Sequence, residues 1–267
     1  MTKRKGIILA GGSGSRLYPL TKAVTKQLLP IYDKPMIYYP LTTLMLAGIY
    51  DILIITTQED LHQMKRLLSN GSQWGINLSY KIQPKPEGLA QALILGEEFL
   101  KQSHCALILG DNLFFGQGLS NLLRLTSKDT KGATMFTYHV SDPERYGVVK
   151  LDNKNKNVLG IEEKPINPPS NFAITGLYFF DETATDRAKQ LKPSSRGELE
   201  ITDLLKSYLY DNILNMKRFG RGYAWLDTGT YNSLLEAGNF VKTITERQGL
   251  QVGSPEDVAL EHGLINL

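Results

Sequence analysis

The chain has little cysteine, little histidine and no long apolar run. Cys105 is the single cysteine among 267 residues, so no disulfide can form within the chain, which fits a reducing compartment and predicts a cytoplasmic location. Cys105 lies in the apolar stretch CALIL, so we expect a core strand there and no catalytic thiol. The four histidines lack metal-ligand spacing, which argues against a zinc site. No apolar stretch approaches the roughly 18 residues that a membrane helix needs, so no membrane span is expected.

Charge of either sign is close to balance. Lys and Arg number 30 and Asp and Glu number 27, for a formal net charge of +3. There is no basic tract and no run of interleaved basic and aromatic residues, so we expect no nucleic-acid partner. At 267 residues and 42% hydrophobic content, the chain is long and apolar enough for one large domain with an ample core.

Short apolar runs alternate with helical patterns through the first half of the chain. Strand-like runs occupy 6–10, 51–56, 78–82 and 106–109, and helical spacing covers 35–47, 59–68 and 89–100. The alternation predicts an α/β fold with a single doubly wound, mostly parallel sheet flanked by helices. After about residue 130, close-set strand patterns at 133–140, 148–151, 158–163 and 173–180 predict an antiparallel part, followed by C-terminal helices at 234–247 and 255–262.

The glycine-rich loop after the first expected strand indicates a polyphosphate site. Gly11, Gly12 and Gly14 let backbone N–H groups turn toward an anion without side chains in the way. Arg16 adds a planar cationic fork and Lys26 a mobile point charge, both suited to phosphate oxygens. The third glycine of the dinucleotide fingerprint is absent, and no Gly-Lys-Ser/Thr closes the loop, so neither that fingerprint nor the P-loop pattern fits.

Two acidic residues end apolar runs at glycine turns. Asp111 stands in LGDN and Asp227 in GYAWLDTGT. Ligands of open α/β sheets bind beyond the carboxyl ends of the strands, so both carboxylates are expected to face a substrate. The alternative role of Asp111, a cap for a helix over 119–125, is less favoured because seven residues, two of them glycines, intervene. Two such carboxylates suit Mg²⁺, which usually takes one or two of them plus substrate phosphate.

Several further positions are ambiguous when taken singly. Glu163 and Lys164 end a strand pattern in EEKP, where an exposed charged edge is the ordinary alternative. Period-two alternation places Lys164 on the opposite face from Glu163. Lys164 can hold a phosphate, and Glu163 can accept hydrogen bonds from sugar hydroxyls. In DPERYG, Tyr146 offers a flat ring beside Gly147, where a pyranose could approach the backbone.

The segment QPKPEGLAQ contributes two more candidates. The Gln83 amide can pair with a pyrimidine edge, and Gly88 permits close approach of the backbone to a ligand. The segment opens a helix, and either residue taken alone is ambiguous. The case for a nucleotide site therefore depends on the combination of these positions with the glycine loop.

The combined pattern GGSGSRL followed by KQLLP resembles the signature of the sugar nucleotidyltransferases, which join a nucleoside triphosphate to a sugar 1-phosphate. Within that superfamily the chain resembles the glucose-1-phosphate thymidylyltransferases, from Gly6 to about Pro255. Ser15 stands where those enzymes often have Thr, and the hydroxyl is retained. The matching stretches are KQLLPIYDKPMIYYPL, SQWGINLSYKIQP, GLAQA, LGDN, DPERYGVV, EEKP, TGLYFF, RGELEITD and GRGYAWLDTGT.

The resemblance implies a Rossmann-like fold and transfer of a thymidylyl group from dTTP to α-D-glucose 1-phosphate, with Mg²⁺ as cofactor and pyrophosphate and dTDP-glucose as products. The implied nucleotide site comprises Gly11, Gly12, Gly14, Ser15, Arg16, Lys26, Gln83 and Gly88. The implied sugar-phosphate pocket comprises Asn112, Tyr146, Gly147, Glu163, Lys164, Ile174, Arg196 and Glu198. Asp111 and Asp227 would hold the metal, and the residues expected to act in catalysis are Arg16, Lys26, Lys164, Asp111 and Asp227.

The resemblance also assigns roles along the chain and predicts an assembly. We expect one domain over 1–267, with 1–130 mainly binding nucleotide, 131–230 mainly binding sugar phosphate, and 231–267 forming a helical tail. Long-form relatives continue past the position of Leu267 with a segment that helps build subunit contacts and a regulatory site. We therefore expect a homo-oligomer, a tetramer more readily than a dimer, with weak or absent inhibition by dTDP-rhamnose. Apolar residues at 114–115 and 234–244 are expected to supply exposed contact patches.

Two alternatives stay open from the sequence. One is a uridylyltransferase acting on glucose 1-phosphate or an amino-sugar 1-phosphate. Thymine and uracil differ by one methyl group, worth about 1–3 kcal/mol in a hydrophobic pocket, so some use of UTP is expected. The other is a non-catalytic nucleotide-sugar sensor. Loss of Arg16, Asp111, Lys164 or Asp227 would favour the sensor, and all four residues are present.

Overall fold

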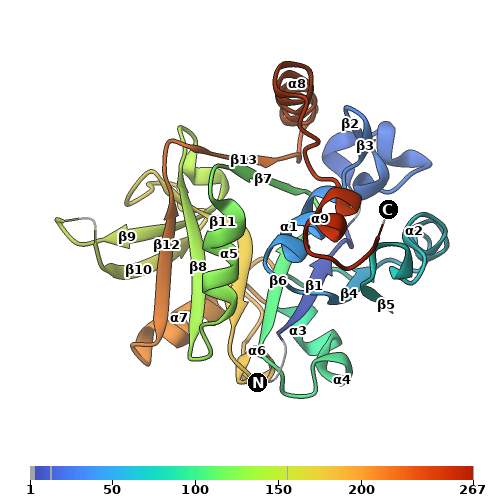
Figure 1. Cartoon of the computed structure of the whole chain (residues 1–267). Coiled ribbons are helices and arrows are strands. Elements are labelled where there is room, and N and C mark those ends of the chain that lie inside the picture. The colour runs from blue at the N-terminus through green and yellow to red at the C-terminus, as the bar shows by residue number, and fades with distance from the viewer. Residues whose placement is uncertain (1–3, 13, 155, 267) are drawn as a thin grey trace.

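The structure is a computed structural model that describes residues 4–12, 14–154 and 156–266, and its centre is a nine-stranded sheet (Figure 1). Four parallel strands form one half of this sheet in the order β6, β1, β4, β5. Their bounds are β1 (Lys5–Leu9), β4 (Asp51–Thr56), β5 (Asn77–Ile82) and β6 (Cys105–Leu109). The strand expectations for this half are confirmed to within a residue at most ends. These parallel strands are rich in apolar residues because helices cover both faces of the sheet.

Two hydrophobic cores, one on each face, hold these helices to the sheet. Ile8 of β1 packs with the first core and Ile7 with the second, since successive side chains of a strand point to opposite faces. The first core includes α1 (Tyr38–Leu46), α2 (Leu61–Leu68), α5 (Leu119–Ser127) and α9 (Pro255–Glu261). The second includes α3 (Gln91–Leu95), α4 (Glu97–Leu100), α6 (Ala184–Lys189) and α7 (Ile201–Tyr210). This arrangement confirms the expected doubly wound α/β fold.

The long strand β11 (Phe172–Phe180) joins the parallel half to the antiparallel part. It pairs antiparallel with β6, β8 and β9, and its register shifts between Ile174 and Tyr178. The surrounding strands are β8 (Ala133–His139), β9 (Gly147–Leu151), β10 (Val158–Glu163) and β12 (Leu214–Phe219). The antiparallel strands expected after residue 130 are thus confirmed, although β12 runs parallel to β8.

Two small sheets complete the fold near the site. β7 (Asn112–Gly116) pairs antiparallel with β13 (Tyr223–Asp227), and β2 (Pro30–Ile31) pairs with β3 (Lys34–Pro35). The helix α8 (Tyr231–Gln248) follows β13 and stands at the top of Figure 1. It begins at a capping box in which Thr230 and Ser233 satisfy each other's backbone N–H groups.

The structure differs from the sequence expectations in several elements. The helix expected over 89–100 is two short helices, α3 and α4, that meet at Gly96. The patterns did not predict β7, β12, β13, α6 or α7. The contact patch expected at 114–115 is wrong: Phe114 is buried, and the Phe115 ring lies 5.6 Å from the ring of Phe240 on α8. Because α8 and β13 fold over this strand, its aromatic residues belong to the core.

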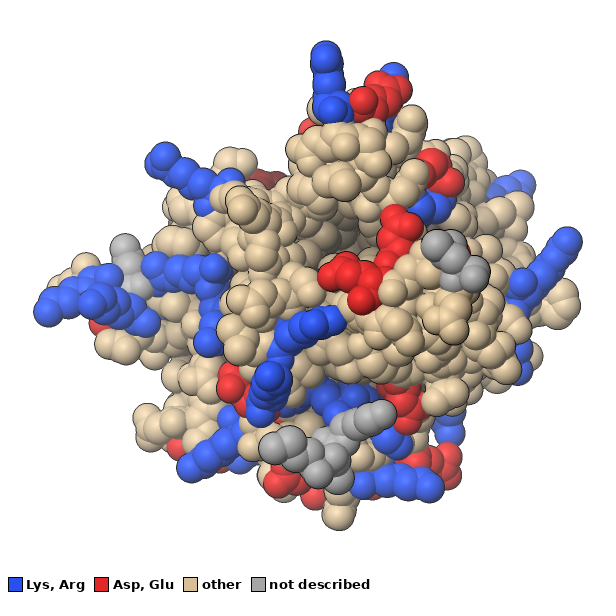
Figure 2. Space-filling view, in the orientation of Figure 1, with Lys and Arg blue, Asp and Glu red and all other residues tan. Residues whose placement is uncertain are grey.

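The buried thiol and the surface charges complete the description of the fold. Cys105 is fully buried in β6, and burial raises the pKa of its thiol to about 12. The expected position of Cys105 in a core strand is therefore confirmed. Figure 2 shows basic and acidic side chains spread over the face in view, without an extended area of one sign. None of the helices in the described part of the chain is long and apolar enough to cross a membrane.

Candidate active site

Two adjoining pockets lie at the carboxyl ends of β1 and β6. The larger pocket has a volume of about 460 Å³, and all eight residues expected to bind the nucleotide line it. The smaller pocket has a volume of about 180 Å³ and is lined by Asn112, Tyr146, Gly147, Glu163, Lys164, Ile174 and Asp227, among others. Arg16, Asp111 and Lys164 line both pockets. The structure therefore brings all the candidate residues into two adjoining pockets that share lining residues.

Arg196 and Glu198 lie elsewhere than the sequence interpretation suggested. Both line the larger pocket and neither lines the smaller one. The Arg196 guanidinium donates to Glu198 at 2.5 Å and to Glu163 at 3.4 Å. Since Glu163 borders both pockets, Arg196 contacts a residue of the smaller pocket without lining it.

The glycine loop and Gln83 fit together closely. A Cβ at position 11 would lie 1.9 Å from the Gln83 side-chain oxygen, so only glycine leaves room for this amide. Gln83 Nε2 donates to Gln91 Oε1 at 2.7 Å. The Glu87 N–H also donates to Gln91 Oε1, while Gln91 Nε2 donates to the Glu87 carboxylate. This chain of bonds fixes both amides, and Gln83 turns its acceptor oxygen toward the loop.

Gly88 is required by its neighbours as well as by the pocket. Its φ is +104°, a region that favours glycine, and a Cβ there would lie 2.4 Å from the backbone oxygen of Leu199. The Leu199 N–H in turn donates to the Glu87 carbonyl at 2.7 Å. The segment before α3 is therefore locked against the segment before α7.

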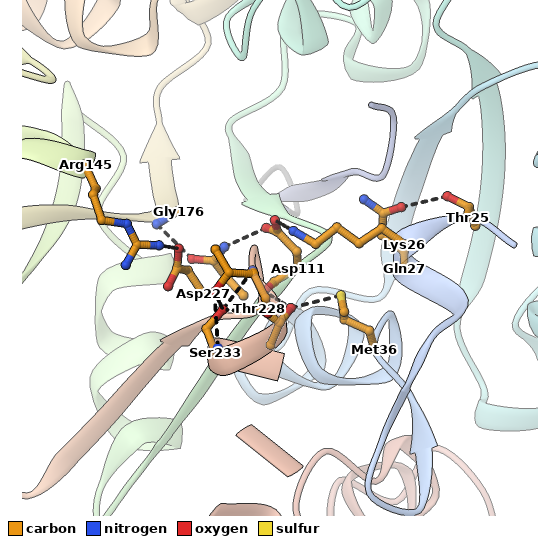
Figure 3. Close-up of polar contacts among 12 residues, drawn as sticks. Thr25, Lys26, Gln27, Met36, Asp111, Arg145, Gly176, Asp227, Thr228 and Ser233 are labelled. Carbon is orange, nitrogen blue, oxygen red and sulfur yellow. Dashed lines mark hydrogen bonds and ion pairs between the residues drawn. The ribbon is translucent and has the colours of Figure 1, made fainter. Parts of the chain in front are cut away.

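Lys26 and Asp111 form an ion pair at the floor of the site. Lys26 lies in a single 3₁₀ turn (Lys26–Leu28), is buried, and donates to Asp111 Oδ2 (Figure 3). The other carboxylate oxygen accepts from the Asn112 amide at 2.8 Å. Burial by itself would raise the pKa of Asp111, but the charge and hydrogen bond of Lys26 outweigh it and hold the pKa below its ordinary value.

Asn112 serves mainly to orient its neighbour. It is buried, and its oxygen accepts from Trp225 Nε1 at 2.6 Å and from the Gly176 N–H at 3.2 Å. Its amide nitrogen then donates to Asp111. Asn112 therefore lines the smaller pocket while tying β7, β11 and β13 to the Asp111 carboxylate.

Asp227 ends β13 and faces a different cation. Its Oδ2 accepts from Arg145 Nη2 at 3.1 Å. Burial raises the pKa of Asp227, opposed by the charge of Arg145 and a hydrogen bond from Tyr146, and the neighbouring charge of Asp111 raises it further. Asp111 and Asp227 both line the smaller pocket, so the two carboxylates share one small space.

The donor set in that space fits a divalent cation shared with a ligand. Asp111 and Asp227 offer hard carboxylate oxygens of the kind that Mg²⁺ prefers. Among residues 4–12, 14–154 and 156–266, no group of three or more His, Cys, Asp or Glu side chains could hold a metal ion by itself. Two carboxylates are nevertheless sufficient where phosphate oxygens and water complete the coordination.

The strand end at Glu163 and Lys164 overturns one expectation. Strict alternation put these side chains on opposite faces, but both line the two pockets. Lys164 lies just beyond β10 with a φ of +42°, and its N–H donates to the Tyr146 carbonyl at 3.0 Å. This left-handed residue ends the alternation, which brings the Lys164 ammonium to 3.9 Å from the Glu163 carboxylate. Burial raises the pKa of Glu163, and the neighbouring Glu200 raises it further.

The structure also adds residues that the sequence interpretation missed. Gln27 is buried, lines the larger pocket and accepts from Thr25 Oγ1 at 2.9 Å. Arg145, Thr202 and Trp225 line the smaller pocket. Gln27 and Arg145 each adjoin a residue already selected, in KQLLP and DPERYG, so inspection of those motifs could have found them. Thr202 and Trp225 also lie in stretches already singled out, RGELEITD and GYAWLDTGT, but neither side chain type by itself indicates a sugar or phosphate contact.

Comparison with known proteins agrees with this geometry. The nucleotidyl transferase family model matches residues 5–244. A glucose-1-phosphate thymidylyltransferase of Xanthomonas campestris pv. campestris is 58% identical over 266 residues, which are 100% of this chain and 90% of that relative. The enzyme of that name from Mycolicibacterium smegmatis is 53% identical over 98% of this chain and 90% of the relative. The chain belongs to the glucose-1-phosphate thymidylyltransferases of the nucleotidyl transferase family.

Solved structures show the same fold. A Bacillus anthracis protein described as a glucose-1-phosphate thymidylyltransferase superposes with a TM-score of 0.83 at 39% identity, covering 95% of this chain and 99% of that one. A UDP-glucose pyrophosphorylase complexed with UDP-glucose superposes with a TM-score of 0.78 at 25% identity, covering 90% of this chain and 98% of that one. The fold is therefore shared with a UDP-glucose pyrophosphorylase as well as with a protein described as a glucose-1-phosphate thymidylyltransferase.

Proposed function

We propose that this protein transfers a thymidylyl group from dTTP to α-D-glucose 1-phosphate, producing dTDP-glucose and pyrophosphate, as the first step of dTDP-rhamnose synthesis. The observation that supports this most strongly is the pair of pockets that meet at Arg16, Asp111 and Lys164. Such a site can hold two phosphorylated substrates with their phosphates together. The choice of substrates is supported by the sequence identity of the chain, 53–58%, with two glucose-1-phosphate thymidylyltransferases.

The larger pocket would bind dTTP. Backbone N–H groups of Gly11, Gly12 and Gly14, with the Ser15 hydroxyl, suit the triphosphate oxygens. Gln83 presents an acceptor oxygen, which matches the N3–H donor that thymine and uracil carry and cytosine lacks. Gly88 would allow the base to approach the backbone.

The smaller pocket would bind glucose 1-phosphate. Tyr146 and Gly147 form one wall, and Glu163 lies where a carboxylate can accept from sugar hydroxyls. Lys164 borders both pockets and would hold the 1-phosphate beside the α-phosphate of dTTP. Arg196 and Glu198, on the wall of the larger pocket, would close the site from the same side.

Asp111 and Asp227 would hold Mg²⁺. When bound, the ion supplies positive charge to phosphate oxygens, as metal ions do in related phosphoryl chemistry. Lys26 fixes the Asp111 carboxylate in its ionised form, as the lowered pKa requires. Arg145 donates to Asp227 in the way that Lys26 donates to Asp111.

The reaction needs positioning and charge neutralisation, without a general base. An anionic oxygen of the sugar 1-phosphate attacks the α-phosphorus in line, a new P–O bond forms, and the bond to the β-phosphate oxygen breaks. Pyrophosphate leaves with the electron pair. Lys164 would orient the attacking phosphate, while Arg16 and Lys26 would stabilise charge on the departing group.

We further propose that the protein is a homo-oligomer, a tetramer more readily than a dimer, with the regional roles expected from the sequence. α8 supplies support because it carries exposed apolar side chains, Tyr231 and Leu235, on an element outside the central sheet. Exposed apolar surface of this kind commonly marks a partner surface, and symmetric association of identical chains is the usual form.

A pyrophosphate-release assay tests the proposed reaction. Four nucleoside triphosphates would each be combined with several sugar 1-phosphates and Mg²⁺. We expect the highest kcat/KM with dTTP and glucose 1-phosphate. Higher kcat/KM with UTP would favour the uridylyltransferase alternative, to which the UDP-glucose pyrophosphorylase likeness gives some support, and absence of turnover with every pair would contradict catalysis.

A further inference from the structure

Each of the two carboxylates at the proposed metal site has its own cation. Lys26 donates to Asp111, and Arg145 Nη2 donates to Asp227 Oδ2 at 3.1 Å. Figure 3 shows these two cationic side chains reaching the carboxylates from opposite sides. Two positive charges are thus already paired with the carboxylates that a divalent cation would use.

The two cations are held in different ways. Lys26 is buried and only 7% exposed, so it has little freedom to leave Asp111. The Arg145 side chain is 36% exposed and ends the short 3₁₀ helix Pro143–Arg145 at the rim of the smaller pocket. Arg145 is therefore the more exposed of the two cations and the one with room to move toward solvent.

Arg145 also has a second anchor that does not depend on Asp227. Its Nη1 donates to Asp142 Oδ2 at 2.6 Å, and its guanidinium carbon lies 5.2 Å from the centroid of the Tyr146 ring. A guanidinium with separate donors can keep one carboxylate while it releases another. If Arg145 leaves Asp227, it remains beside the smaller pocket.

The contact with Asp227 has a direct consequence for metal binding. The oxygen that Arg145 contacts, Oδ2, is one of the two that Asp227 could offer to a divalent cation. Placing that cation within coordination distance would also bring it close to the guanidinium, and like charges repel strongly at such short range. The divalent cation must therefore compete with Arg145 for Asp227.

We propose that Arg145 is a positioning residue that holds Asp227 in the metal-free protein and competes there with the divalent cation. The anionic sugar 1-phosphate, arriving in the smaller pocket, draws the guanidinium away from Asp227 while Asp142 retains it. Binding of sugar phosphate and of metal would consequently reinforce each other. This inference rests on the proposed metal site but not on which sugar or nucleotide reacts.

The test is Mn²⁺ binding to the nucleotide-free protein, measured by electron paramagnetic resonance at constant pH. Arg145→Gln removes the competing charge and should tighten Mn²⁺ binding, by roughly fivefold for a partly exposed ion pair. Asp142→Asn removes the second carboxylate partner of Arg145, so Arg145 should pair more strongly with Asp227 and Mn²⁺ binding should weaken. Arg145→Lys retains the charge and should remain closer to the wild type than Arg145→Gln does. A purely structural role would weaken binding in all three variants, so opposite shifts are diagnostic.

The coupling gives a second measurement. Glucose 1-phosphate should tighten Mn²⁺ binding in the wild type and do so less in Arg145→Gln. Equal or weaker Mn²⁺ binding by a folded Arg145→Gln protein would overturn the proposal. If Arg145→Gln does not fold, unchanged or tighter Mn²⁺ binding by Asp142→Asn would overturn the proposal instead. If Asp227→Asn leaves Mn²⁺ binding intact, Asp227 is not a metal ligand and the proposal loses its premise. Failure of dTTP turnover alone would contradict only the proposed reaction.

Discussion

Asp227 is the register partner of Asn112 at the end of the two-stranded sheet formed by β7 and β13. The pairing sets Asp227 beside Asp111, although the two acids are far apart in the sequence. The Thr228 N–H and hydroxyl, which both donate to the Asp111 carbonyl at 3.1 and 2.8 Å, hold the same junction. Backbone pairing, rather than a side-chain contact alone, therefore brings the two carboxylates of the site together.

Replacement of either carboxylate by its amide should nearly abolish turnover and leave the fold intact. Asp111→Asn and Asp227→Asn each remove one negative charge from the proposed metal site, and loss of one such electrostatic element typically costs roughly 10²–10³ in rate. Pyrophosphate release measures the rate, and circular dichroism checks the fold. EDTA should silence the wild type, and added Mg²⁺ should restore it. Rates within about threefold of wild type in both variants would remove the metal assignment.

Arg16→Ala and Lys164→Ala should affect different substrates. Arg16 belongs to the glycine loop, so its loss should reduce both dTTP binding and the rate, because charge builds on the departing pyrophosphate. Lys164→Ala should weaken glucose 1-phosphate binding more than dTTP binding. Titration calorimetry with each ligand separates these effects. A Lys164 variant that loses dTTP affinity and keeps sugar-phosphate affinity would mean that the pockets have been assigned in reverse.

Base selectivity should follow from the orientation of Gln83. We expect dTTP to be preferred over UTP by about ten- to hundredfold in kcat/KM, since the thymine methyl group is worth about 1–3 kcal/mol in a packed pocket. CTP should be poor because its N3 is an acceptor facing the Gln83 oxygen, and ATP and GTP should fail on size. Gln83→Leu should reduce turnover of dTTP, while Gln190→Leu, at the exposed end of α6 and outside both pockets, is the matched control. Efficient use of purines would leave only the superfamily assignment.

The sequence was sufficient for every strand of the central sheet except β12, and for the residue types of the site. Periodic apolar runs and the glycine loop act locally, so β1, β4, β6 and their neighbours could be located from the sequence. The pairing of β13 with β7 could not, because it joins residues 112–116 to 223–227 through tertiary contacts. The orientation of Lys164 was missed for a local reason: one residue with a φ of +42° reverses what alternation predicts. Arg145 adjoins Tyr146 in DPERYG and could have been selected with it, but its pairing with Asp227 could not be foreseen because the two residues are distant in the sequence.

The outer face of α8 should mediate self-association. Leu235 is 65% exposed on this helix, whereas Phe240 packs on Phe115 and belongs to the core. Leu235→Asp should therefore shift the oligomer toward smaller species without unfolding the chain, and Glu236→Asp is the matched control. Light scattering coupled to size exclusion measures the mass. A wild-type monomer at micromolar concentration would contradict the assembly.

Glu163 should give sugar binding and stability opposite dependences on pH. Burial and the neighbouring Glu200 raise the pKa of Glu163 above its ordinary value of 4.5. Between that value and the raised pKa, the folded state binds more protons than the unfolded state. The contribution of Glu163 to the free energy of unfolding therefore falls as pH rises through this window, and is most favourable below it.

Sugar binding should change in the other direction. Only the ionised Glu163 is a full acceptor for sugar hydroxyls, so affinity for glucose 1-phosphate should rise as pH increases through the same window. Calorimetric titrations and thermal melts from about pH 4.5 upward would follow both quantities. Glu163→Gln should bind the sugar phosphate more weakly at neutral pH. It should also lose the part of the pH dependence of binding and of stability that comes from the Glu163 carboxyl. Glu162→Gln, on the exposed side of β10, is the control and should behave as the wild type. If Glu163→Gln retains the wild-type pH profile of binding, another group controls it, and the sugar does not rely on this carboxylate.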